Sequence, residues 1–131
     1  MKLLLDTHIW LWSLVAPERL SRRVARALED ADNELWLSPV STWELCVLVE
    51  RGRVVLGGDV ASWVADAFRR VPLHEAPLTH EVALATASVR LPHRDPADRL
   101  LAASAAVFEL SLVTADERLL GVRSVRTFAN R

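Results

Sequence analysis

The hydrophobic residues of this chain fall into two patterns, short continuous runs and helical spacings. The first run covers residues 3–5, between Lys2 and Asp6, a comparable run follows Glu34 within residues 34–37, and another lies at 112–113. Continuous apolar runs of this length are typical of parallel strands that are covered on both faces. We therefore predict strands at these places, with a further strand at Val71–Leu73 and an edge strand at Ser124–Phe128.

The segments between these runs have apolar residues three and four positions apart, which predicts helices. Ser21, Asp59 and Thr79 are suitable N-cap residues, and Gly52 is a suitable residue to follow a helix end. The predicted helices cover 7–15, about 22–31, about 40–51, 60–70, about 81–89 and a segment beginning near Pro96, with a helical turn at 117–120. Strands that alternate with helices indicate an α/β fold with a parallel sheet and right-handed crossovers.

Four acidic residues occupy comparable places in this layout. Asp6 and Asp116 follow predicted strands, whereas Glu44 and Asp98 lie early in predicted helices. Such positions converge on one crevice at the carboxyl edge of a doubly wound sheet, and Asp95 is close enough in sequence to be a fifth member. Each acid also has a purely structural interpretation, as a helix cap or as a partner of a helix dipole.

If the four carboxylates converge, their mutual repulsion indicates the chemistry of the site. Two like charges about 4 Å apart repel by roughly 4 kcal/mol at an effective dielectric constant of 20. The cluster therefore requires either raised pKa values or a bound cation. Carboxylate oxygens without imidazole or thiolate partners favour Mg²⁺ or Mn²⁺, and such sites act on phosphate esters through metal-activated water.

Composition limits the remaining choices. The length of 131 residues suits one domain, residues 1–131, and the net charge of −1 gives no overall basic field. Fifteen of the 16 basic residues are arginines, which suits bidentate phosphate contacts but also fits a bias of genome composition. Cys46 is the only cysteine, and no apolar stretch approaches the roughly 20 residues of a membrane span. We expect a soluble cytoplasmic protein.

Several other functional classes lack their motifs. No glycine-rich phosphate loop is present, and the histidines at 8, 74, 80 and 93 lack metal-ligand spacing. We interpret His93 as an exposed loop residue. A haloacid-dehalogenase-type phosphatase would have a second aspartate where this chain has His8, and a receiver domain would need a late lysine, whereas the only lysine is Lys2.

Four segments together resemble the PIN-domain ribonucleases of the VapC toxin type. They are LLLDTHIWLW at 3–12, SPVSTWEL at 38–45, HRDPADRLLAA at 93–103 and LVTADERLL at 112–120. The resemblance runs from Met1 to about Val125. It implies a Rossmann-like, three-layer α/β/α PIN fold and an Mg²⁺- or Mn²⁺-dependent endoribonuclease that leaves a 5′-phosphate.

The same resemblance implies the roles of individual residues. Asp6, Glu44, Asp98 and Asp116 would be the catalytic, metal-binding acids, with Asp95 as an accessory acid. Thr114 would orient the site by hydrogen bonding.

The resemblance also implies partners: an RNA substrate, a VapB-type antitoxin encoded alongside, and a second copy in a homodimer, with no membrane. Trp10 or Trp12 is expected at a dimer or antitoxin contact. Two alternatives stay open, a non-catalytic PIN-like binding module and a metal-dependent phosphatase.

Overall fold

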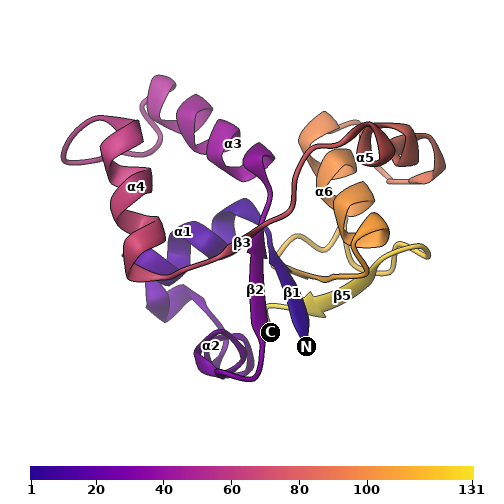
Figure 1. Ribbon diagram of the computed structural model, residues 1–131, viewed down its shortest axis with the longest axis horizontal. Helices are drawn as coiled ribbons and strands as arrows, with labels where there is room; N and C mark the ends of the chain where they lie inside the picture. The colour runs from indigo at the N-terminus through magenta and orange to yellow at the C-terminus, as the bar shows by residue number, and fades with distance from the viewer.

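The computed structural model describes residues 1–131 as a parallel β-sheet between layers of helices (Figure 1). Its five strands are arranged in the order β3-β2-β1-β4-β5, and every neighbouring pair is parallel. The strands are β1 (Lys2–Leu5), β2 (Glu34–Leu37), β3 (His74–Glu75), β4 (Ser111–Thr114) and β5 (Arg126–Ala129). The predicted α/β class with a central parallel sheet is confirmed.

Alternating side chains of the central strands divide the core between the two faces of the sheet. Leu4 and Leu112 pack with residues of α5 (His80–Ala85) and α6 (Pro96–Val107). Leu3 and Leu5 pack on the other face with residues of α1 (Thr7–Val15), α2 (Arg22–Glu29), α3 (Pro39–Glu50) and α4 (Val60–Arg70). Because β1 is buried on both faces, its residues 3–5 form a continuous apolar run in the sequence. No helix combines the length and apolarity that a membrane crossing needs.

The predicted helix starts are present with their caps. Ser21 accepts a hydrogen bond from the backbone N–H of Val24 over 3.1 Å, and Asp59 and Thr79 accept equivalent bonds at the starts of α4 and α5. Gly52 follows α3 with a φ of 69°, a left-handed conformation that glycine adopts without strain. The three predicted caps correctly mark where α2, α4 and α5 begin.

Three predicted boundaries are wrong. The third strand lies at His74–Glu75 rather than Val71–Leu73, because α4 continues to Arg70 and Pro72 has no N–H to donate to a neighbouring strand. The helix predicted to reach residue 89 ends as α5 at Ala85 and tightens into a 3₁₀ turn, Thr86–Ser88. The last strand is β5, shifted by about two residues from its predicted range.

Candidate active site

Two of the predicted acids follow neighbouring strands. Leu5 of β1 pairs with Val113 of β4, and the N–H of Asp6 donates to the carbonyl of Val113 over 3.0 Å. Asp116 follows β4 by two residues, so its backbone and that of Asp6 leave the sheet at the same carboxyl edge. The parallel register therefore brings together two acids that are 110 positions apart in sequence.

Thr114, the last residue of β4, links these two acids. Its buried hydroxyl donates to Oδ2 of Asp6 over 2.7 Å and accepts the backbone N–H of Asp116 over 3.0 Å. The other oxygen of Asp6, Oδ1, accepts the N–H of Thr7 over 2.7 Å and so caps α1. Asp6 is a helix cap and at the same time lines a cavity that other acids also line.

Two helices supply the other acids. Glu44 lies in α3 and Asp98 in the first turn of α6. The Thr7 hydroxyl donates to Oε1 of Glu44 over 2.5 Å, and the hydroxyl oxygens of Thr7 and Ser41 are 2.9 Å apart. Thr7 and Ser41 were not predicted as site residues. The available signal was their spacing, since Thr7 adjoins Asp6 and Ser41 lies one helical turn before Glu44.

Asp95 is the N-cap of α6 and also lines the same cavity as Asp6. Its Oδ1 accepts the backbone N–H groups of Ala97 and Asp98 over 2.9 and 3.3 Å. The structural interpretation of Asp95 as a cap therefore applies, and the cap lies beside the other acids. Burial is the main reason that the pKa values of Glu44 and Asp98 are raised, and charge repulsion from Asp95 adds to it.

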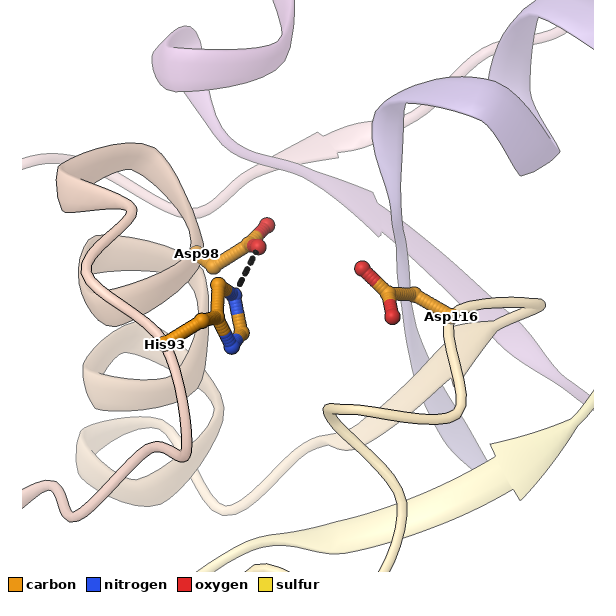
Figure 2. A group of neighbouring side chains, drawn as sticks. All are labelled: His93, Asp98 and Asp116. Carbon is orange, nitrogen blue, oxygen red and sulfur yellow. Dashed lines mark hydrogen bonds and ion pairs between the residues drawn. The ribbon is translucent and has the colours of Figure 1, made fainter.

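The expectation of an exposed His93 is wrong. Figure 2 shows the imidazole against Asp98, with Nε2 2.6 Å from Oδ2 of that carboxylate. The His93 side chain is only 12% exposed. Potential ligand atoms of His93, Asp98 and Asp116 all lie within 4.8 Å of one another. A histidine five residues before an acid, with a helix start between them, is the sequence signal for this contact.

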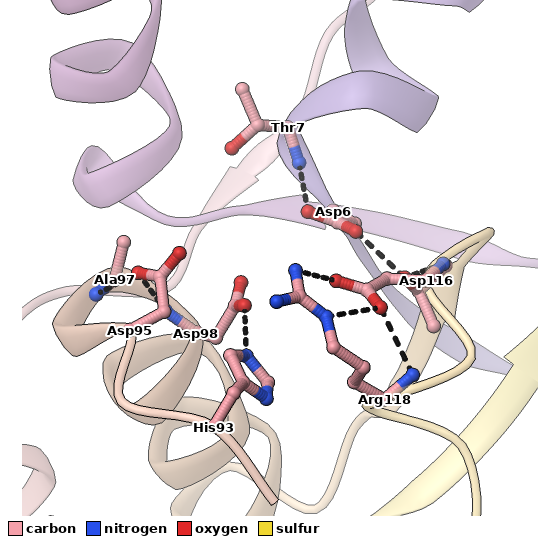
Figure 3. Close-up of polar contacts among 9 residues, drawn as sticks. Asp6, Thr7, His93, Asp95, Ala97, Asp98, Asp116 and Arg118 are labelled. Atoms are coloured by element: carbon pink, nitrogen blue, oxygen red, sulfur yellow. Dashed lines mark hydrogen bonds and ion pairs between the residues drawn. The ribbon is translucent and has the colours of Figure 1, made fainter. Parts of the chain in front are cut away.

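Asp116 has a partner that the sequence did not reveal. The Arg118 Nε donates to Oδ1 of Asp116 over 3.1 Å, and Nη2 donates to Oδ2 over 2.9 Å (Figure 3). This bidentate pair lowers the pKa of Asp116, although the arginine side chain is 57% exposed. Asp116 is therefore already ionised at neutral pH, with both carboxylate oxygens hydrogen-bonded to Arg118.

All of these acids line one cavity of about 410 Å³, which we call the acid-lined pocket. A volume of this order is in the range of small-molecule sites in proteins. The pocket also has two arginines on its wall. Its lining residues are Asp6, His8, Trp12, Arg19, Glu44, Asp95, Asp98, Ala115, Asp116 and Arg118.

Burial and mutual repulsion oppose ionisation of three of the acids. Burial raises the pKa of Asp6, and repulsion from the Asp98 charge raises it further. The hydrogen bond from Thr114 acts in the opposite direction and lowers this pKa. Burial and the neighbouring carboxylates raise the pKa of Glu44 to about 7. The pKa of Asp98 is also raised, chiefly by burial, while the hydrogen bond from His93 lowers it.

The donor set of the pocket fits a hard divalent cation. A cation among these carboxylates would offset both desolvation and repulsion, the two causes of the raised pKa values. The oxygens come from several elements and face one volume, as Mg²⁺ and Mn²⁺ sites require. The pocket has no thiolate, and its lining contains one imidazole, that of His8, beside five carboxylates; His93 is not part of the lining.

The expectation for the tryptophans needs correction at Trp10. Trp10 is buried against Trp63 and Phe68, and it is only 2% exposed. Trp12 is half-buried under the guanidinium of Arg19. The exposed tryptophan is Trp43, at 59%, and it lines a separate apolar groove of about 670 Å³ with Phe68.

The sequence model of the PIN domain matches residues 3–124. The chain belongs to the PIN-domain family. Among PIN-domain relatives, it is 36% identical over 126 residues to Ribonuclease VapC22 of Mycobacterium tuberculosis, covering 94% of this chain and 93% of that protein. The family resemblance inferred from the four sequence segments is confirmed.

Solved structures share this PIN fold at low sequence identity. A DNA-bound VapBC2 structure from Rickettsia felis contains a chain with a TM-score of 0.74 and 16% identity, covering 98% of each chain. A DNA-bound VapBC structure from Salmonella typhimurium contains one with a TM-score of 0.69 and 18% identity, covering 100% of this chain and 99% of that chain. At these identities the likeness concerns the fold.

Proposed function

We propose that this protein is a divalent-metal-dependent endoribonuclease and the toxin of a VapBC-type module, acting in the cytoplasm as one PIN domain. The observation that carries the proposal is the convergence of five carboxylates on the acid-lined pocket. Three of them have raised pKa values that a cation would relieve. The 36% identity to Ribonuclease VapC22 supports RNA as the substrate.

In this proposal Asp6, Glu44, Asp98 and Asp116 hold Mg²⁺ or Mn²⁺. Asp95 and Thr114 act as accessory groups. A bound ion would supply an attacking water of lowered pKa and would stabilise the charge on the leaving oxygen of the phosphodiester. The hard oxygen donors of the pocket support Mg²⁺ or Mn²⁺ over zinc.

The protein's own residues orient and tune these acids. Thr7 and Thr114 fix both oxygens of Asp6, so its carboxylate has one orientation before any ligand arrives. Glu44, with its pKa of about 7, holds a proton on its carboxyl group for part of the time at neutral pH and releases it when a cation binds. Arg118 and Arg19 line the pocket and can bind RNA phosphates, because guanidinium groups match phosphate geometry.

The antitoxin and the second protomer are part of the proposal. The apolar groove beside α3 and α4 is lined by Trp43, Cys46 and Phe68, with Trp43 and Phe68 59% and 42% exposed. Exposed aromatic side chains in a groove are typical of protein contacts. We expect Trp43→Asp to weaken capture of the antitoxin in a pull-down and to leave Mn²⁺ binding unchanged.

The test of the function is cleavage of purified RNA with and without divalent metal. Asp6→Asn keeps the shape of the side chain and removes its charge, and Asp32→Asn is an exposed control. We expect metal-dependent cleavage by the wild type and the control, and none by Asp6→Asn or after chelation. A folded Asp6→Asn protein that cuts RNA at the wild-type rate contradicts the proposal. Faster hydrolysis of a generic aryl phosphate than of RNA would favour the phosphatase alternative.

A further inference from the structure

His93 is a buried histidine that lies beside the acid-lined pocket but outside its lining. It comes from the loop after Pro92, and its Nε2 is 2.6 Å from Oδ2 of Asp98 (Figure 2). Both side chains are strongly buried, with 12% and 10% exposed. A short contact between a buried imidazole and a buried carboxylate is a charge-assisted hydrogen bond and holds both groups in place.

The two ring nitrogens of His93 have different surroundings. Nε2 is engaged with Asp98, whereas Nδ1 is the only buried side-chain nitrogen or oxygen in the protein without a hydrogen-bond partner. The tautomer with its proton on Nε2 satisfies the carboxylate and leaves only a lone pair unpaired at Nδ1. With Nε2 donating to Asp98, the lone pair of that nitrogen is not available to a metal ion, and Nδ1 is buried in a residue outside the lining of the acid-lined pocket.

The same contact divides the roles of the two Asp98 oxygens. Oδ2 accepts the imidazole N–H, while Oδ1 accepts no hydrogen bond from the protein. The repulsion from the Asp95 and Asp116 carboxylates would otherwise favour rotation of Asp98 away from the cluster. A donor at Oδ2 opposes that rotation and keeps Oδ1 directed for binding.

We propose that His93 is a positioning residue, which holds Asp98 by the Nε2–H···Oδ2 bond so that the carboxylate is oriented to bind the metal ion without the imidazole being a ligand itself. The inference rests on the proposed function, because it assigns His93 to the metal centre of that function. Partners that hydrogen-bond a ligating carboxylate from outside the ligand shell typically contribute 10- to 100-fold to metal affinity.

The variants separate a hydrogen-bond role from packing. His93→Ala removes the donor, His93→Gln places an amide N–H near the position of Nε2, and His93→Asn places its amide near Nδ1, too far from Asp98. His80→Ala is the control, since His80 is exposed at the start of α5. The measurement is Mn²⁺ affinity by calorimetry on the full chain, with thermal unfolding in chelator to establish folding of each variant.

We expect His93→Ala and His93→Asn to weaken Mn²⁺ binding by about 10- to 100-fold and His93→Gln to restore most of the affinity. The electron spin echo spectrum of the Mn²⁺-loaded protein should show the same ¹⁴N modulation in the wild type and in His93→Asn, because His93 is not expected to be a ligand. If His93→Ala does not fold, the difference in Mn²⁺ affinity between His93→Gln and His93→Asn tests the inference. Equal affinities of the wild type and His93→Asn, failure of His93→Gln to bind better than His93→Asn, or a directly bound ¹⁴N that is lost in His93→Asn would overturn the inference.

Failure of this inference can be distinguished from failure of the proposed function. If the wild type binds Mn²⁺ with the expected dependence on residue 93 but leaves RNA intact, the ribonuclease proposal fails and the role of His93 stands. If the wild type cuts RNA and His93→Asn binds Mn²⁺ normally, only the role of His93 fails. A wild type that binds no Mn²⁺ overturns both.

Discussion

Glu44→Gln should make the metal-free protein more stable at alkaline pH. The Glu44 carboxyl has a pKa of about 7 instead of 4.5, because it is partly buried and lies near other carboxylates. Glutamine has the same shape and keeps an oxygen that can accept the hydrogen bond of the Thr7 hydroxyl, which spans 2.5 Å. The substitution therefore removes an unfavourable charge while keeping the contact.

The sign of the pH dependence follows from proton binding. Between pH 4.5 and about 7 the folded protein holds a proton on Glu44 that the unfolded chain has lost, so the free energy of unfolding decreases as pH rises. The stability contributed by the protonated group is complete below pH 4.5 and is lost as pH rises through 7. The raised pKa values of Asp6 and Asp98 act in the same direction.

The magnitude follows from the difference between the two pKa values of Glu44. A change from 4.5 to about 7 corresponds to at most about 3.4 kcal/mol. The side chain is partly exposed, so solvent screening reduces this to about 1–2 kcal/mol. For a domain of 131 residues, a gain of that size raises the midpoint of thermal unfolding by about 4–7 °C.

The assay is urea unfolding in chelator at pH 5 and pH 8.5, followed by circular dichroism. Glu50→Gln is the matched control, because Glu50 is exposed on the same helix, α3. We expect the free energy of unfolding of Glu44→Gln to be clearly higher than that of the wild type at pH 8.5, and most of this difference to disappear at pH 5. Glu50→Gln should unfold with nearly the wild-type free energy at either pH. An advantage of Glu44→Gln that is equal at the two pH values, or a loss of stability at pH 8.5, would refute the reasoning.

Three further predictions concern the same pocket. Thr114→Val removes the hydrogen bonds to Asp6 and Asp116 at a buried position, so it should lower the free energy of unfolding by about 1–3 kcal/mol and weaken Mn²⁺ binding; unchanged urea midpoint and calorimetric affinity would contradict this. Arg118→Ala removes both guanidinium hydrogen bonds to Asp116 and frees its Oδ2, while Oδ1 keeps the backbone N–H of residue 118. This variant should tighten Mn²⁺ binding in calorimetry while weakening RNA binding, and Arg123→Ala, which alters an exposed arginine outside the pocket, should do neither. Mn²⁺ at 100 times its dissociation constant should raise the free energy of unfolding of the wild type by about 2.7 kcal/mol, measured by thermal unfolding with and without the ion. Asp6→Asn should be stabilised much less by the same Mn²⁺ concentration.

The strands were predictable where burial alone determines the sequence pattern. Residues 3–5 and 112–113 are apolar at every position because both faces of β1 and β4 are covered by helices. β3 was misplaced, because its two residues, His74 and Glu75, are exposed and polar and carry no hydrophobic signal. It is recognised as a strand only through its pairing with β2.

The acids of the site were predictable because their positions follow from strand ends and helix starts. Their hydrogen-bond partners were not, since the pairing of Thr7 with Glu44 depends on how α1 packs against α3. The burial of His93 depends on the path of the loop before α6, for which the sequence provides only the spacing to Asp98. A polar residue in a loop is predicted to be exposed from the sequence alone, because only the tertiary structure reveals whether other segments cover it.

The central claim is that the carboxylates of the acid-lined pocket hold a divalent cation. It is tested most directly by anomalous diffraction from crystals grown with Mn²⁺. The expected result is a peak within coordination distance of carboxylate oxygens of Asp6, Asp98 and Asp116, with the Arg118 guanidinium displaced from Asp116. A well-ordered, intact pocket without a manganese peak, or with manganese bound only elsewhere on the protein, would contradict it.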